Sequence, residues 1–245
     1  MPHAMETRSQ RAYVAYEALR LAFFPWQRER RLKRERERVE AARRGMMIAA
    51  AYSHSLAIRP DGSVACWGCN DDDQAPPDGV PGDFVMVAAG VRHSLALRLD
   101  GTIACWGDNG FGRAPPAGVP GDFVMVAAGG AHSLALRRDG SVACWGCNDD
   151  DQAPPDGVPG DFVMVAAGLD HSLALRRDGG VACWGCNDEG QAPPDGVPGD
   201  FVAIAAGLDH SLALRRDGSV ACWGDSTYGQ APPAGVVGPF GHVDV

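Results

Sequence analysis

The chain has 245 residues, a formal net charge of −9 and 45% hydrophobic residues, a length that accommodates one large domain or two small ones. Residues 1–45 hold twelve Lys and Arg against six Asp and Glu, whereas the remainder holds ten against twenty-five. This acidic remainder argues against nucleic-acid binding, because phosphate recognition needs clustered basic residues. No apolar run approaches the ~18–20 residues of a membrane-spanning helix.

Residues 1–44 are predicted to form a charged α-helical extension. Apolar residues recur at near-helical spacing between positions 13 and 23, and a proline at position 25 interrupts them. Residues 28–44 combine basic and acidic side chains at i,i+4 spacing, which is typical of an exposed helix. We expect a solvated helix. The alternatives are docking on the acidic remainder, a nuclear-localisation-like cluster, or an organelle-targeting helix, which the glutamates argue against.

Residues 45–239 consist of five copies of a 39-residue repeat without insertion or deletion. Each copy contains a His-Ser-Leu-Ala-Leu/Ile segment, followed after the Asp-Gly pair by a Cys-Trp-Gly triplet. The histidines of this segment are His54, His93, His132, His171 and His210. A repeat of this length is one supersecondary unit that buries its apolar faces only by stacking on copies of itself.

The fourth copy illustrates the expected elements. Short apolar runs at 163–167, 171–176 and 180–184 predict three strands. The Asp178-Gly179 pair between the last two predicts a tight hairpin turn, because that turn needs positive φ. Prolines cannot donate to a β-ladder, so residues 192–199 are predicted to be a connection or at most an edge.

Alternation within the second strand predicts how the units stack. In the fourth copy, Leu173 and Leu175 share one face, while Ser172 and Ala174 share the other. Large residues of one unit then meet small residues of the next, which favours a radial arrangement with short edges. The predicted fold is all-β, a β-propeller of about five three-stranded blades, with a linear β-solenoid as the alternative.

The stretch from Val202 to Gly224 resembles the repeat of the regulator of chromosome condensation family. Its short-repeat branch, which includes a propeller-type β-lactamase inhibitor protein, is the most similar. The resemblance rests on Val202-Ala203-Ile204-Ala205-Ala206-Gly207, the His-Ser-Leu-Ala-Leu segment, Asp-Gly and Trp223-Gly224. It covers about four fifths of the chain and implies a propeller of three-stranded blades.

Some positions depart from the family pattern. Asp73 and Asp151 replace a loop glycine, and we expect the turn to persist because Asp tolerates left-handed φ better than most residues. Full-size members of the family close seven blades, whereas this chain has five copies. Residues 240–245 align with the first strand of a sixth copy, so they are either its start or a closing strand. The five blades therefore either close as a small ring or form an open arc that another chain completes.

The repeated histidines and cysteines are candidates for metal or redox chemistry. Imidazole binds many transition metals, but a residue present in every copy is expected to be structural, bonded to a neighbouring backbone carbonyl. Cys66/Cys69, Cys144/Cys147 and Cys183/Cys186 have C-x-x-C spacing, yet the first cysteine lies in a predicted strand and not at a helix N-terminus. Zinc would need two such pairs brought together. We expect no metal, cofactor or catalytic site.

Functional signal is expected in the loops where the copies differ, at 69–74, 108–113, 147–152, 186–191 and 225–230. Acidic loops concentrate negative potential and can steer a basic partner, although a solvated loop is the alternative. Loop-tip aromatic residues are favoured as interface anchors. The predicted partner-binding residues are Phe111, Tyr228, Asp72, Asp73, Asp150, Asp151, Asp188, Glu189 and Arg113.

We interpret the chain as a protein-interaction propeller, a scaffold or recognition module that binds a protein partner through its loop rims and no membrane. No copy carries a nucleophile–base pair that the others lack, so enzymatic activity is not expected. The resemblance implies two alternatives, nucleotide exchange on a small GTPase and inhibition of an enzyme. The resemblance implies that exchange activity depends on an inserted wedge in one blade. The five repeats here all have 39 residues, so no such insertion is present in them.

Cysteine usage and the N-terminus predict the compartment. A disulfide framework would normally accompany a signal peptide, and the first residues are charged and polar without an apolar core. We expect a cytoplasmic protein with reduced thiols, with the nucleus as the alternative.

Overall fold

A computed structural model describes residues 47–238 and Phe240, and every regular element within this range is a strand. The predicted helical extension over 1–44 lies outside the described residues, as does all of the segment over 240–245 except Phe240. Within 47–238, no helix has the length and apolar character needed to span a membrane.

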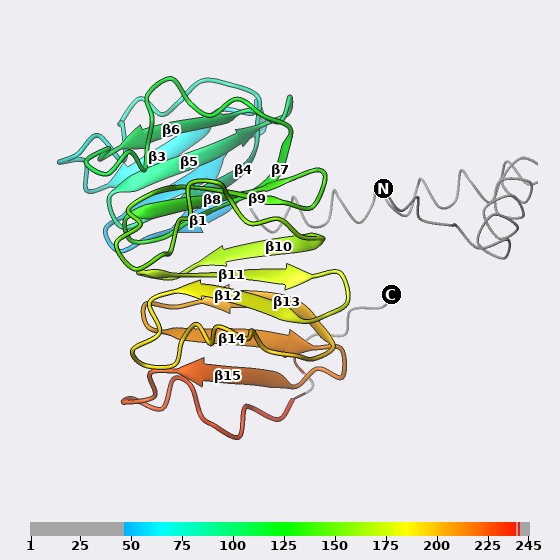
Figure 1. Ribbon diagram of the computed structural model, residues 1–245. Helices are drawn as coiled ribbons and strands as arrows, with labels where there is room; N and C mark the ends of the chain where they lie inside the picture. Colours follow the sequence, from blue (N-terminus) through cyan, green and yellow to red (C-terminus); the bar gives the residue numbers. More distant parts are fainter. Residues whose placement is uncertain (1–46, 239, 241–245) are drawn as a thin grey trace, which may run out of the picture. The chain divides into compact units, whose positions relative to one another are not determined.

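In the described part of the chain, fifteen strands form five antiparallel sheets of three, each sheet built from consecutive strands (Figure 1). The strands are β1 (Ile48–Ala50), β2 (His54–Ile58) and β3 (Val64–Gly68); β4 (Phe84–Ala89), β5 (His93–Arg98) and β6 (Ile103–Gly107); β7 (Phe123–Ala128), β8 (His132–Arg137) and β9 (Val142–Gly146); β10 (Phe162–Ala167), β11 (His171–Arg176) and β12 (Val181–Gly185); β13 (Phe201–Ala206), β14 (His210–Arg215) and β15 (Val220–Gly224). The prediction of three-stranded blades is confirmed.

The fourth blade follows its predicted boundaries to within one residue. Its first strand begins at Phe162, where a β-bulge separates it from Met164, and β11 has the predicted bounds. The proline segment adds a single bridge between Val181 and Val197, so it is the expected short edge. At the hairpin, Gly179 has a φ of 94°, and a side chain there would meet the Asp200 Cα at 3.0 Å.

The two loop positions where Asp replaces Gly keep the left-handed turn. Asp73 and Asp151 have φ values of 60° and 62°, close to the 79° of the equivalent Gly190. The amide of Asp151 donates to the Asn148 carbonyl at 3.3 Å, as the amide of Gly190 donates to the Asn187 carbonyl at 3.1 Å. The expectation that the turn persists is confirmed.

Blades stack large face on small face. Leu173 of the fourth blade and Ala213 of the fifth are both 0% exposed and belong to one apolar cluster. Leu134 of the third blade and Ala174 of the fourth share another cluster in the same way. The predicted complementarity between faces is therefore the packing rule of the core.

Each described blade packs on its sequence neighbours. β2 packs on β4, β5 on β7, β8 on β10 and β11 on β13. In the part of the chain that the structure describes, no strand of the first sheet forms a packed pair with a strand of the fifth. Figure 1 shows these two sheets at opposite ends of a curved stack. The described blades form an open arc and not a closed ring.

Candidate protein-binding rim

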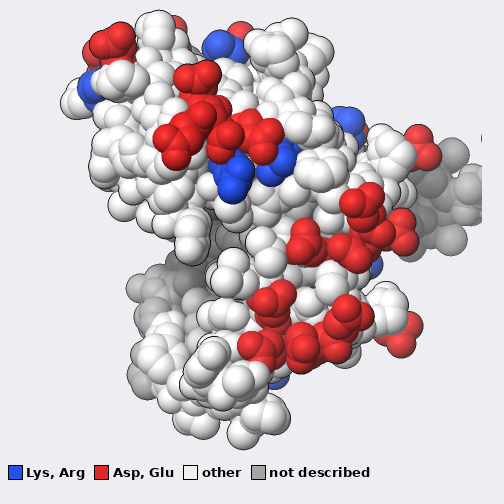
Figure 2. All heavy atoms as spheres, turned by 90° about the vertical axis from the view of Figure 1, so that its left-hand side faces the viewer, with Lys and Arg blue, Asp and Glu red and all other residues white. Residues whose placement is uncertain are grey.

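The five loops after the third strands lie at the same end of the blades. We call them the rim loops, residues 69–74, 108–113, 147–152, 186–191 and 225–230. In the fourth blade, the last residue of β12 pairs with His171 at the start of β11, which places this loop beside the turn between the first and second strands. Figure 2 views this end and shows Asp and Glu side chains gathered over several blades.

Hydrogen bonds within the fourth rim loop hold its backbone in place. The Asn187 side-chain oxygen accepts from the Ala192 amide at 2.8 Å, and the Gln191 side-chain oxygen accepts from the Glu189 amide at 2.9 Å. Gln191 is 1% exposed, whereas Asp188 and Glu189 are exposed. The loop therefore presents its acidic side chains to solvent from a fixed frame.

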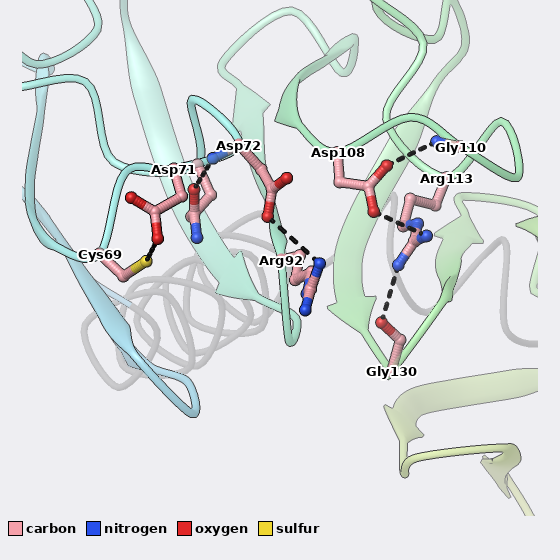
Figure 3. A network of polar contacts seen from close by, with 9 residues as sticks. Cys69, Asp71, Asp72, Arg92, Asp108, Gly110, Arg113 and Gly130 are labelled. Carbon is pink, nitrogen blue, oxygen red and sulfur yellow. Dashed lines mark hydrogen bonds and ion pairs between the residues drawn. The ribbon is translucent and has the colours of Figure 1, made fainter.

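The predicted acidic residues lie on this surface with one difference in exposure. Asp72 is half-buried and lies 3.8 Å from Arg92 of the next blade (Figure 3). The exposed residues are Asp73, Asp150, Asp151, Asp188 and Glu189. Burial, and then the neighbouring carboxylate of Asp150, raise the pKa of Asp170. Carboxylates of adjacent blades thus feel one another across the rim.

The two predicted aromatic anchors are exposed. Tyr228 is 91% exposed and Phe111 is 55% exposed, both in rim loops. Exposed aromatic side chains of this kind are common at the centre of interfaces. Their role in binding a partner stays a prediction.

Arg113 lies beneath the rim surface. It is 6% exposed, pairs with Asp108 at 2.9 Å and donates to the Gly130 carbonyl at 3.4 Å (Figure 3). Its guanidinium also lies 5.2 Å from the centre of the Phe111 ring. Arg113 therefore supports the second rim loop from below, and we do not expect it to contact a partner directly.

An apolar hollow at the centre of the arc was not predicted from the sequence. Its volume is about 620 Å³, and its lining comes from the ends of the first strands of all five blades, where the sequence is Ala-Ala-Gly in four copies and Ala-Ala-Ala in the first. The residue after each segment also contributes, and these are Tyr52, Val91, Gly130, Leu169 and Leu208. This position differs between copies, so the variation that identified the rim loops could have identified it too.

The repeated histidines form junctions between blades. His93 Nε2 lies 2.9 Å from the Ser133 hydroxyl, which itself donates to the Arg113 carbonyl at 3.0 Å. Because the hydroxyl has a single proton, Nε2 must be the donor toward it. Nδ1 is then an unprotonated atom, and it has no hydrogen-bond partner among the described residues. The expected bond to a backbone carbonyl was wrong, since a serine of the next blade accepts instead.

The same junction joins each of the first four blades to the next. His54, His132 and His171 lie 2.8–2.9 Å from Ser94, Ser172 and Ser211 respectively. Burial lowers the pKa of His93 to about 3, and burial also lowers the pKa values of His132 and His171 to about 4. These imidazoles are neutral at pH 7, and their role is to connect neighbouring blades.

The cysteines of the Cys-Trp-Gly triplets face the core. Burial raises the pKa of Cys66 to about 11 and that of Cys144 to about 12, which suppresses the reactive thiolate. The second cysteine of the first pair, Cys69, is half-buried and donates to Asp71 at 3.4 Å. This environment is the opposite of a redox-active C-x-x-C pair.

Known proteins with similar folds span more sequence than this chain. The CRINKLY WD40 ectodomain of the Arabidopsis thaliana receptor kinase ACR4 matches with 25% identity and a TM-score of 0.58 over 78% of this chain and 65% of its own. Yeast RCC1 (Prp20), solved bound to Kap60, matches with 24% identity and a TM-score of 0.60 over 72% and 55%. Human WBSCR16 matches with 22% identity and a TM-score of 0.64 over 79% and 64%. The chain therefore spans less than two thirds of each of these structures.

A comparison with curated protein sequences found no match. The model of the regulator of chromosome condensation (RCC1) repeat, by contrast, matches five times, and its matches cover more than half of the chain. They fall at residues 48–74, 84–113, 123–152, 162–191 and 201–230. With five matching repeats folded as five three-stranded blades, the chain belongs to the RCC1 repeat family.

Proposed function

We propose that the chain is a non-catalytic protein-interaction module whose partner binds the rim loops and the central hollow. The observation that carries this proposal is the placement of exposed apolar side chains beside acidic ones at one end of the blades. Tyr52 is 88% exposed and Leu208 59% exposed at the hollow, and Tyr228 stands in a rim loop. Exposed apolar side chains that gather at one end of a protein are typical of interaction sites.

The negative charge of the rim indicates that the partner carries basic residues. A second hollow, of about 310 Å³, lies between the fourth and fifth rim loops and is lined by Asp188, Glu189, Asp209 and Asp225. Negative potential on this scale steers a basic partner toward the surface. We expect a protein that presents an apolar or aromatic side chain flanked by Lys or Arg. We also propose a cytoplasmic location for this chain, with the nucleus as the alternative, and the free thiols of the cysteines are compatible with either compartment.

Affinity capture with the full chain tests this function. The rim variant carries Leu208→Ser and Tyr228→Ser, and the control carries Leu99→Ser at a residue that is 64% exposed at the opposite end of the second blade. A partner identified by mass spectrometry should be lost with the rim variant and kept with the control. The partner should also bind the double variant Asp188→Asn/Glu189→Gln more weakly than wild type. Salt should weaken that binding less than it weakens binding to wild type.

Two outcomes contradict the proposal. The first is a partner that binds wild type and rim variant equally, which would place the binding surface elsewhere. The second is accelerated nucleotide release from a member of a small-GTPase panel, which would favour the exchange activity that the resemblance implies.

A further inference from the structure

The junction between neighbouring blades is made of two unlike halves. The earlier blade supplies a histidine Nε2, a leucine and the backbone carbonyl of the last rim-loop residue. The later blade supplies a serine hydroxyl, an alanine and a tryptophan Nε1. At the third junction, for example, the Gln152 carbonyl accepts from Ser172 at 2.9 Å and from Trp184 at 3.0 Å.

These halves meet four times within the chain with nearly the same geometry. Tryptophan donates to the rim carbonyl at 2.8–3.0 Å in all four junctions. Serine donates to the same carbonyl at 2.9–3.0 Å. The interface is thus a standard contact of the molecule and does not depend on one local sequence.

Among the strands that the structure describes, the first sheet carries the later half of a junction, and no earlier blade packs on it. Trp67 is 54% exposed, whereas the tryptophans of the other four blades are half-buried. Ala57 is half-buried, although its counterparts Ala96, Ala135, Ala174 and Ala213 are 0% exposed. Among the described residues, neither the Ser55 hydroxyl nor Trp67 Nε1 has a hydrogen-bond partner.

The fifth sheet carries the earlier half of a junction, and no later blade packs on it in the part of the chain that the structure describes. Leu212 is half-buried, although Leu56, Leu95, Leu134 and Leu173 are 0% exposed. His210 is half-buried, whereas His93, His132 and His171 are 0% exposed. Within 47–238, His210 has no serine to receive its Nε2, because the open arc keeps it from Ser55.

We propose that a second copy of this chain docks head-to-tail, its first sheet against the fifth sheet of the copy before it. His210 and Leu212 of one copy would then meet Ser55 and Ala57 of the other, which reproduces the internal junction. Because the two faces differ, the contact is heterologous and leaves one face free at each end. Association therefore continues beyond a dimer unless the rotation closes a ring.

Sedimentation velocity on the full chain tests this proposal with two face variants. Ala57→Arg blocks the face of the first sheet, and Leu212→Arg blocks the face of the fifth. Wild type should form species larger than the 25.8 kDa monomer as concentration rises, whereas each variant alone should stay monomeric. An equimolar mixture of the two variants should form a dimer and grow no further, because one intact junction remains.

Leu99→Arg places the same charge away from both faces and should behave as wild type. Circular dichroism of each variant confirms its fold, and formation of the mixed dimer confirms that the unmodified faces are intact. A wild type that is monomeric at every concentration would overturn the proposal and indicate that the chain's own segments cover the faces. Self-association that survives in Ala57→Arg, or a mixture of folded variants that forms no dimer, would overturn it as well.

Discussion

The fourth and fifth blades contain the same second-strand sequence in different surroundings. Their second strands, β11 and β14, have the same sequence, His-Ser-Leu-Ala-Leu-Arg. Five of six residues of β11 are buried, whereas only two of six are buried in β14. Burial here is a property of the stack and not of the repeat, so stability should follow the number of neighbours that a blade has.

The largest expected effect is a fall in the free energy of unfolding in acid, where the histidines of the central blade junctions become protonated on unfolding. Burial holds the pKa values of His93, His132 and His171 at about 3 to 4, below the ordinary 6.5. Because the folded-state pKa is the lower one, this stabilisation is complete above pH ~6.5 and is lost as pH falls toward the folded pKa. Between these two pKa values, each histidine should lower the free energy of unfolding by about 1.4 kcal/mol for every pH unit that the pH falls.

Denaturant titrations between pH 7 and pH 4 measure this slope. Replacing one central histidine, as in His132→Gln, should lower the slope, because one of the buried imidazoles that take up a proton on unfolding is gone. An unchanged slope would show that other groups account for the acid sensitivity.

A matched pair of leucine truncations compares the two blades directly. Leu173→Ala in the fourth blade should lower the free energy of unfolding by about 2–5 kcal/mol, because it leaves a cavity in a fully buried site. Leu212→Ala in the fifth blade should cost about half as much, since one side of its side chain is already open. Unfolding is measured at concentrations where the chain is monomeric. Equal losses would mean that something covers the fifth sheet.

The smallest expected effect is the stability gained by restoring glycine in the rim-loop turn, and it should be the same in a terminal and a central blade. Asp73→Gly in the first blade and Asp151→Gly in the third each relieve a left-handed φ, and we expect a gain of about 0.5–1 kcal/mol. Both loops are held by their own hydrogen bonds, so the neighbouring blades should not matter. The reverse change, Gly190→Asp, should cost a similar amount, and a gain confined to one blade would contradict a purely local turn.

Much of the fold follows from the sequence because local signals and the repeat agree. The Asp178-Gly179 turn, the alternation in β11 and the prolines after β12 predict the blade to within a residue. The stacking rule follows as well, since Leu173 and Ala174 point to opposite faces of the strand. Each of these features depends on neighbours in the chain or in the next copy.

Features that depend on the whole arc could not be predicted in this way. Whether five blades close depends on the angle between blades, which no single repeat encodes. The bond from His93 to Ser133 crosses between blades, so local reasoning assigned the wrong acceptor. Arg113 was predicted to bind a partner, but it is buried and forms an ion pair with Asp108.

The candidate surface was predicted in part. Variation between copies identified the rim loops correctly as the exposed acidic end, including Phe111 and Tyr228. The central hollow was missed because its walls are nearly the same in every blade, Ala-Ala-Gly in four copies and Ala-Ala-Ala in the first, and mainly the residue after them varies. Tyr52 and Leu208 belong to that varying position.

Hydrogen–deuterium exchange of the monomeric chain tests the open arc most directly. Peptides that reach from β11 through Gly180 and from β14 through Ser219 differ in mass but share the strand sequence. Their intrinsic exchange rates are therefore nearly equal, and any difference reports packing. An open arc predicts slow exchange in β11 and markedly faster exchange in β14. Equal protection of the two strands in the monomer would contradict it and indicate a closed ring.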